Sequence, residues 1–209
     1  MRSRLNFIPV IVVITLLLTF SNCSLDINDD TRKVYGEGPI VTQTLQADTF
    51  NTFQHLAIGR VLIDTGDSLE VTISAQQNIM DEMEFEFVDD IFAWGFKEEI
   101  QIVEADSITM TIKMPNEIEE ILIVGAGEMT LSGAKQEQIT IGVIGVADLY
   151  AYGLEVDICE LYISGSARCR LMVNEEINGS ITGIGDIYYK GEPAINVMQS
   201  GVVNFYNDN

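Results

Sequence analysis

The stretch ILIVGAGEMTLSG at residues 121–133 decides the fold, because close variants of it recur along the rest of the chain. Each variant has small residues at its centre and alternating apolar residues on both sides. Such alternation is typical of a β-strand with one buried face, and the small residues indicate a bend between two strands. The variants are ITIGVIGVADLYAYG (139–153), CELYISGSARCRLMV (159–173) and GSITGIGDIYYKG (179–191).

The bends follow one another at a nearly constant spacing. Aligned on the second small residue, the copies lie 20, 20 and 18 positions apart, and a further glycine continues the series at 16. The aligned residues are Gly127, Ala147, Ala167, Gly185 and Gly201. A period near twenty residues, made of strands and glycine turns, indicates a β-solenoid whose stacked turns bury a shared core. The glycines expected in the bends are Gly125, Gly127, Gly145, Gly165, Gly183, Gly185 and Gly201.

The residue two places after each aligned position is apolar and is predicted to face the core. Each such buried side chain contributes about 1.5–3 kcal/mol. An earlier, isolated copy around Gly59 adds one member to this column. A β-sandwich is the alternative fold because it is also rich in short strands, although it does not require equal spacing. The predicted column is Val61, Met129, Leu149, Cys169, Ile187 and Val203.

The N-terminal half of the domain, residues 39–117, is less regular. Four segments alternate as strands, and QQNIMDEM (76–83) is typical of one short helical turn. The half is interpreted as an irregular start of the same solenoid, so that residues 39–209 form a single domain. The four strand segments are 69–75, 83–90, 91–97 and 107–115.

The first residues have the pattern of an export signal. Two arginines precede the apolar run 7–20, which is too short for a comfortable membrane span. Cys23 follows where a bacterial lipoprotein carries its lipidated cysteine, so residues 1–22 are predicted to be a signal peptide. An ordinary cleaved signal is the alternative. Residues 23–38 are acidic and polar and are predicted to tether the domain to a membrane through the lipid.

The charge balance excludes some partners. The chain has 32 acidic and 11 basic residues among 209, a net charge of −21. A nucleic-acid-binding protein needs a basic patch, so nucleic acid is not an expected partner. The acidic balance also argues against docking on anionic lipid by charge alone.

The chain resembles the family described as putative auto-transporter adhesin, head GIN domain, over roughly residues 40–206. The resemblance is carried by SITMTIKMPNEIEEILIVGAGEMTLSG (107–133), by the glycine turns, and by GIGDIYYKGEPAINV (183–197). The family's usual turn is Ser-Gly-Ser-Gly-Asp, which is reduced here to GAGE, GVAD, GSAR and GIGD. The resemblance implies a right-handed β-helix in an exported bacterial protein, and it implies no catalytic mechanism.

Three acids in one predicted column, Glu128, Asp148 and Asp186, raise the possibility of a calcium site. Arg168 interrupts that column, and a hard cation needs six or more oxygens from a formed loop. Solvated corner charges are therefore the favoured interpretation, and no metal or cofactor is expected.

The cysteines and the histidine are the remaining reactive candidates. Cys159 and Cys169 are both predicted to face inward, as free core residues or as a disulfide pair. His55 is the only histidine, and a core position is favoured over a catalytic one. No nucleophile elbow, phosphate loop or zinc-protease motif occurs.

Outward tyrosines are the candidate binding residues. Tyr162 and Tyr188 fall on outward positions, where they could stack on sugar rings or contact a protein. Ordinary strand tyrosines, favoured by β propensity, are the alternative interpretation.

The sequence thus favours a non-enzymatic envelope lipoprotein that displays a rigid solenoid for adhesion or for binding a glycan or protein. It would be exported and held at the outer membrane, on the cell surface or the periplasmic face. A polysaccharide-active enzyme is one alternative, because so many acids will include suitable carboxylate pairs. A periplasmic scaffold that self-associates through its open end is another.

Overall fold

The computed structural model describes residues 31–66, 68–97 and 100–209. The predicted signal peptide and Cys23 lie outside the described residues. The all-β prediction is confirmed, and the short helix α2 (Gln77–Met80) falls inside the segment expected to make one helical turn. The strands are β1 (Arg32–Tyr35), β2 (Ile40–Leu45), β3 (Thr52–Leu56), β4 (Ile58–Thr65), β5 (Glu70–Gln76), β6 (Met83–Val88), β7 (Ile91–Phe96), β8 (Ile100–Glu104), β9 (Thr109–Met114), β10 (Glu120–Gly133), β11 (Gln136–Lys190) and β12 (Ala194–Asn207).

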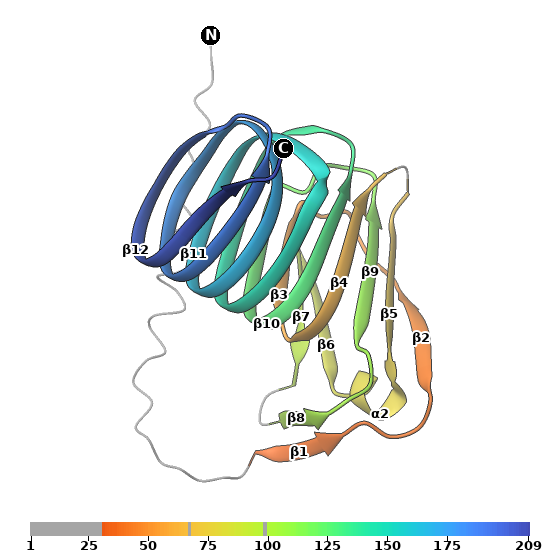
Figure 1. Ribbon diagram of the computed structural model, residues 1–209. Helices are drawn as coiled ribbons and strands as arrows, with labels where there is room; N and C mark the ends of the chain where they lie inside the picture. The colour runs from red at the N-terminus through yellow and green to blue at the C-terminus, as the bar shows by residue number, and fades with distance from the viewer. Residues whose placement is uncertain (1–30, 67, 98–99) are drawn as a thin grey trace. The chain divides into compact units, whose positions relative to one another are not determined.

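The prediction of a single right-handed parallel β-helix over residues 39–209 is wrong. The strands form a curled, half-barrel-like sheet of mixed parallel and antiparallel strands (Figure 1). The pairs β2–β5, β5–β9 and β6–β7 are antiparallel. The physical reason lies in the N-terminal half, where the glycine bends of the later copies are missing. Hairpins and helix α2 reverse the chain there, and reversal produces antiparallel neighbours.

The C-terminal strands pair in parallel, and the chain passes round the curl several times (Figure 1). We call each pass a winding. β10 pairs with β11 at an offset of 20 residues, as in Glu120↔Thr140. β11 pairs with β12 at an offset of 18, as in Asp186↔Asn204. The early copy also joins this register, because Gly59 pairs with Gly127.

The alignment is wrong in one place. Gly201 pairs with Gly183, two residues earlier than expected, so Val203 stands opposite Gly185. The inward residue of the last winding is therefore Phe205, which pairs with Ile187. The other predicted core residues are almost fully buried: Val61, Met129, Leu149, Cys169 and Ile187.

Part of the predicted tether is ordered structure. β1 pairs in parallel with β8, and Val34 in β1 is buried. The compact unit accordingly begins at Arg32 rather than at residue 39.

One glycine of each bend holds the windings together. Gly125, Gly145, Gly165, Gly183 and Gly201 all have a positive φ, between 112° and 141°. A Cβ on any of the last four would lie 2.0–2.2 Å from the carbonyl oxygen of the glycine one winding earlier. Both the backbone conformation and the spacing therefore require glycine. The second bend glycines, Gly127 and Gly185, have no positive φ.

We expect Gly183→Ala to destabilise the fold strongly and Gly185→Ala to be tolerated. The positive φ alone costs about 1–3 kcal/mol for a residue with a Cβ, and the clash with the Gly165 carbonyl oxygen adds to it. At Gly185 the nearest atom is a side-chain methyl of Ile181 at 3.2 Å, and alanine already stands there in the copies with Ala147 and Ala167. Urea unfolding followed by circular dichroism measures both variants. Equal losses of stability would contradict this role of the first bend glycine.

Candidate functional site

His55 is a core residue and not an accessible base. Its side chain is 1 % exposed, and its ring lies 5.1 Å from the ring of Trp94. Neither ring nitrogen has a hydrogen-bond partner of good geometry among the described residues. Burial lowers the pKa of His55 to about 4, and the nearby backbone of Ala126 offsets this only in part. The ring also explains Gly127, because a Cβ there would lie 2.6 Å from its Nε2.

We expect the free energy of unfolding to decrease as the pH falls from 6.5 to 4, because His55 is buried in its neutral form. The unfolded chain takes up a proton near pH 6.5, whereas the folded chain does so only near pH 4. The resulting loss is about 3 kcal/mol at the acid end of this range. As the only histidine, His55 gives a single pair of imidazole resonances whose titration reports its pKa by NMR. The variant His55→Leu should lack this part of the pH dependence, and a titration near 6.5 would contradict the buried neutral imidazole.

The two described cysteines are free and fully buried. Burial raises the pKa of both thiols, that of Cys169 to about 12. A buried thiol of high pKa is unreactive, because the thiolate is the reacting form. Cys159 and Cys169 are therefore free core residues rather than a disulfide pair.

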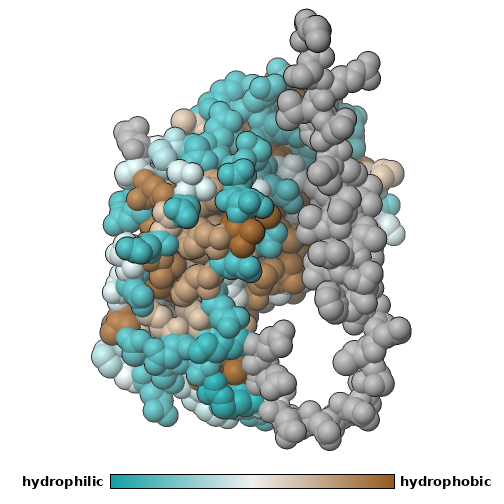
Figure 2. Space-filling view, turned by 180° about the vertical axis from the view of Figure 1, so that it is seen from behind, coloured by the Kyte–Doolittle hydropathy of each residue, from teal (hydrophilic) through white to brown (hydrophobic). Residues whose placement is uncertain are grey.

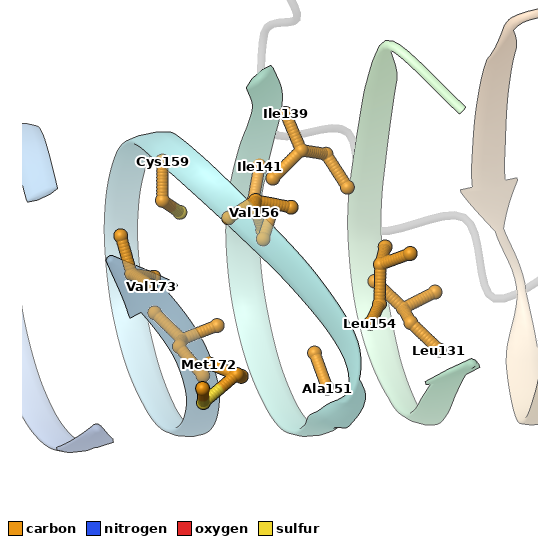
Figure 3. A pocket seen from close by; sticks show the side chains of 10 residues that line it. Leu131, Ile139, Ile141, Ala151, Leu154, Val156, Cys159, Met172 and Val173 are labelled. Carbon is orange, nitrogen blue, oxygen red and sulfur yellow. The ribbon is translucent and has the colours of Figure 1, made fainter. Parts of the chain in front are cut away.

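A small cavity lies between successive windings beside Cys159 (Figure 3). Its volume is about 10 Å³, and its labelled lining residues are apolar side chains such as Leu131, Ala151 and Val173. This volume is at the lower limit for one water molecule. The cavity is a packing defect of the core and offers no ligand site.

Each acid of the predicted column has a side-chain partner on a neighbouring winding. Arg60 Nε lies 3.0 Å from the Glu128 carboxylate, and Arg168 lies 3.6 Å from that of Asp148. Asn204 donates a hydrogen bond of 3.1 Å to Asp186. Among the described residues no group of three or more potential ligands could hold a metal ion. The column is a polar ladder along the outside of the sheet.

One carboxyl group in the described part of the chain has a raised pKa. Burial raises the pKa of Glu120, which begins β10. Its register neighbours are Thr52 and Thr140, which carry no carboxylate. Glycosidases use two facing carboxylates, and neither residue paired with Glu120 supplies the second one.

Tyr188 belongs to a stacked ladder. The ring centroids of Tyr188 and Tyr206 are 4.8 Å apart, with an angle of 21° between the ring planes. In the winding before Tyr188, the guanidinium carbon of Arg170 lies 5.5 Å from the Tyr188 ring centroid. Arg170 also lies 4.5 Å from the centroid of Tyr150. The faces of Tyr188 thus already contact neighbouring side chains, which leaves the outer face of Tyr206 for a ligand. Sequence patterns could not show this, because it depends on register.

The other predicted binding residue is also engaged. Tyr162 is half-buried, and its hydroxyl donates a hydrogen bond of 3.1 Å to Glu160. Burial raises the pKa of Tyr162, and the neighbouring Glu160 carboxylate adds to this effect. Tyr162 and Tyr188 therefore lie on the sheet without forming one joint site.

Exposed aliphatic side chains form a second row that sequence reasoning missed. Val146, Ile184 and Val202 directly follow bend glycines, and Ser166 and Ala126 occupy the same place in the remaining windings. Three valine and isoleucine side chains are more than half exposed: Val146 58 %, Ile184 54 % and Val202 63 %. Ile58 is 40 % exposed and pairs with Ala126 in the same row. We call Ile58, Val146, Ile184 and Val202 the corner row. The signal was present in the apolar residue after Gly125, Gly145, Gly183 and Gly201, although Ser166 follows Gly165.

Apolar side chains also gather on the face turned away from the viewer of Figure 1, where hydrophilic ones border them (Figure 2). Independently, strand β3 and the β6–β7 hairpin expose large apolar residues. Leu56 is 46 % exposed, Val88 49 % and Ile91 38 %. The protein thus exposes apolar surface in more than one place. Exposed contiguous apolar surface is typical of interaction sites.

The chain belongs to the family described as putative auto-transporter adhesin, head GIN domain. The family model matches residues 49–144 and again 100–193, which together span most of the compact unit. The resemblance drawn from the turn motifs is therefore confirmed. The family points to a non-enzymatic, adhesion-like role at the cell envelope.

Two solved structures share the fold. A putative adhesin from Bacteroides fragilis is 16 % identical with a TM-score of 0.56, over 83 % of this chain and 99 % of that one. A putative lipid-binding protein from Parabacteroides distasonis is also 16 % identical with a TM-score of 0.56, over 84 % and 100 %. At this identity the likeness concerns the fold alone. No curated protein matches the sequence.

No helix in the described part of the chain has the length and apolar character needed to cross a membrane.

Proposed function

We propose that the protein is a non-enzymatic envelope lipoprotein that holds an adhesive surface away from the membrane. The lipid on Cys23 is the anchor, and the curled sheet beginning at Arg32 is the displayed part. The corner row is the contact surface for a protein partner. The observation that carries the proposal is the in-register exposure of Val146, Ile184 and Val202 on a sheet whose windings are fixed by glycine contacts.

The corner row suits a protein partner better than a sugar. Its side chains are aliphatic, and burying one against a partner stabilises a contact by about 1.5–3 kcal/mol. Sugar rings stack on aromatic faces, but Tyr188 has both neighbours of its ladder in place. The row also needs little ordering on binding, because its residues lie in paired strands: Val146 pairs with Ala126 of β10, and Val202 pairs with Ile184 of β11.

Display at the surface is tested by treating intact cells with protease. We expect the full chain to be cut while a periplasmic control protein survives. We further expect Cys23→Ser to leave the membrane fraction, because the substituted chain cannot be lipidated. Protection of the chain until the outer membrane is opened would contradict outward display and support the periplasmic scaffold. Retention of Cys23→Ser in the membrane would contradict the anchor.

The corner row is tested by charge substitution in cells that display the full chain. We expect the double variant Val146→Glu, Ile184→Glu to lose adhesion to a neighbouring cell layer, because each glutamate must be desolvated in an apolar contact. The matched control is Ser164→Glu, Thr182→Glu, which adds the same charge at exposed positions of the same strand. Adhesion is counted as retained cells after washing. Equal losses in both variants would show a charge effect and contradict the corner row.

A further inference from the structure

The last strand of the sheet has an open edge. Among the described residues β12 pairs with β11 and with no other strand. Its sequence AINVMQSGVVNFYN contains no charged residue and no proline. Proteins usually protect such an edge with charges, proline or a bulge, because its free N–H and C=O groups accept a further strand. This edge has 14 residues and none of the first two protections.

The apolar core is also uncovered at this end. Ile195 is 36 % exposed, whereas Ile177, its neighbour one winding earlier, is fully buried. Phe205 is partly buried against the core, whereas its neighbour Ile187 is fully buried. Covering β12 would therefore bury apolar side chains as well as pair the backbone.

The side-chain ladders end here in neutral groups. Asn196 donates to Asn178 at 3.1 Å, and Asn178 in turn donates to Glu160 at 3.1 Å. Asn204 likewise ends the column of Asp186. Carboxylates of the inner windings are thus replaced at the edge by amides, which can bond to one another. Tyr206, 42 % exposed, leaves the outer face of the tyrosine ladder open.

We propose that the β12 edge pairs with the β12 edge of a second copy of this chain. Two identical edges that face each other are related by a two-fold axis, so the strands run antiparallel and the assembly closes as a dimer. The contact joins the two cores end to end. This inference does not require the corner row to bind a partner, although Val202 belongs to both surfaces, and it does not depend on the direction in which the protein faces.

The other sheet edges match β12 less well. β2 and β6 end the sheet on its other side, with six residues each. β6 carries Glu84 and Glu86. β12 turns a corner at Gly201, where φ is 135°, so a short strand could follow only one arm of it. A second β12 has the same length and the same bend.

The charge of the chain supports a contact at this place. Two copies with a net charge of −21 each repel one another. Close contact is then least opposed where no charged side chain lies, and β12 is the longest described strand without one.

Cross-linking of the full chain in its own cells tests the dimer. Single cysteines are placed along the edge, as Met198→Cys, Ser200→Cys, Val202→Cys and Asn204→Cys, and a short bis-maleimide is added. We expect a band of twice the chain mass, strongest at one position and weaker on both sides of it, because only residues near the two-fold axis meet their own copies. The native Cys159 and Cys169 are buried and do not react. The unsubstituted chain controls for Cys23.

Ser164→Cys is the matched control, since Ser164 is exposed on an inner winding and outside the corner row, and it should give no dimer band. In the best cysteine variant, placing glutamate at Met198 and Val202, or at the one of them that does not carry the cysteine, should lower the dimer band by about tenfold or more, because like charges face each other across the axis. Adding Thr182→Glu, outside β12 and the corner row, should not lower it. No dimer band at any β12 position would overturn the proposal. Species larger than a dimer in light scattering of the detergent-solubilised full chain would also overturn it, in favour of head-to-tail pairing with β2 or β6.

Discussion

The close approach of glycine backbones at one corner of each winding is the constraint on which the rest of the structure depends. Gly145, Gly165, Gly183 and Gly201 each leave no room for a Cβ above the carbonyl oxygen of the winding below. This approach fixes the register of the parallel strands, and the register decides which side chains stack. The buried column from Val61 to Ile187, the ion pairs Arg60–Glu128 and Arg168–Asp148, and the tyrosine ladder all follow from it. The corner row is exposed because it stands next to these glycines on the outside of the bend.

The sequence predicts the parallel part of the fold well and the N-terminal part poorly. Between residues 121 and 191 alternation and glycine spacing act together, so the pairing of Gly127 with Ala147 could be read directly. The last winding was misaligned because Val203 is not small. It stands opposite Gly185 at the uncovered end of the core, where a larger side chain has space. In the N-terminal half, hairpins and α2 give antiparallel pairs, which a parallel repeat cannot foresee.

The candidate site shows the same division. Alternation correctly places Tyr162 and Tyr188 away from the buried column. It cannot show their contacts, because Tyr162 bonds to Glu160 and Tyr188 stacks with side chains of the neighbouring windings. These contacts decide how much of each ring is left for a ligand. His55 lies in the core, as the sequence favours, and neither of its ring nitrogens has a hydrogen-bond partner of good geometry among the described residues. Its burial depends on Trp94 in β7 and on the missing side chain of Gly127, which lie far from it in sequence. Such contacts are not visible in a local pattern.

The pairing distances along the chain also imply an order of assembly. β3 and β4 pair with β10, more than sixty residues later, so the first closed layer needs most of the N-terminal half to be present. Each later winding pairs with residues only 18–20 positions earlier. Closing a long loop costs more entropy than closing a short one, and contacts distant in sequence slow folding. We therefore expect the nucleus to form once, around β4, β9 and β10, and the remaining windings to add to it one after another. A chain that emerges N-terminus first from an export channel delivers its segments in this same order.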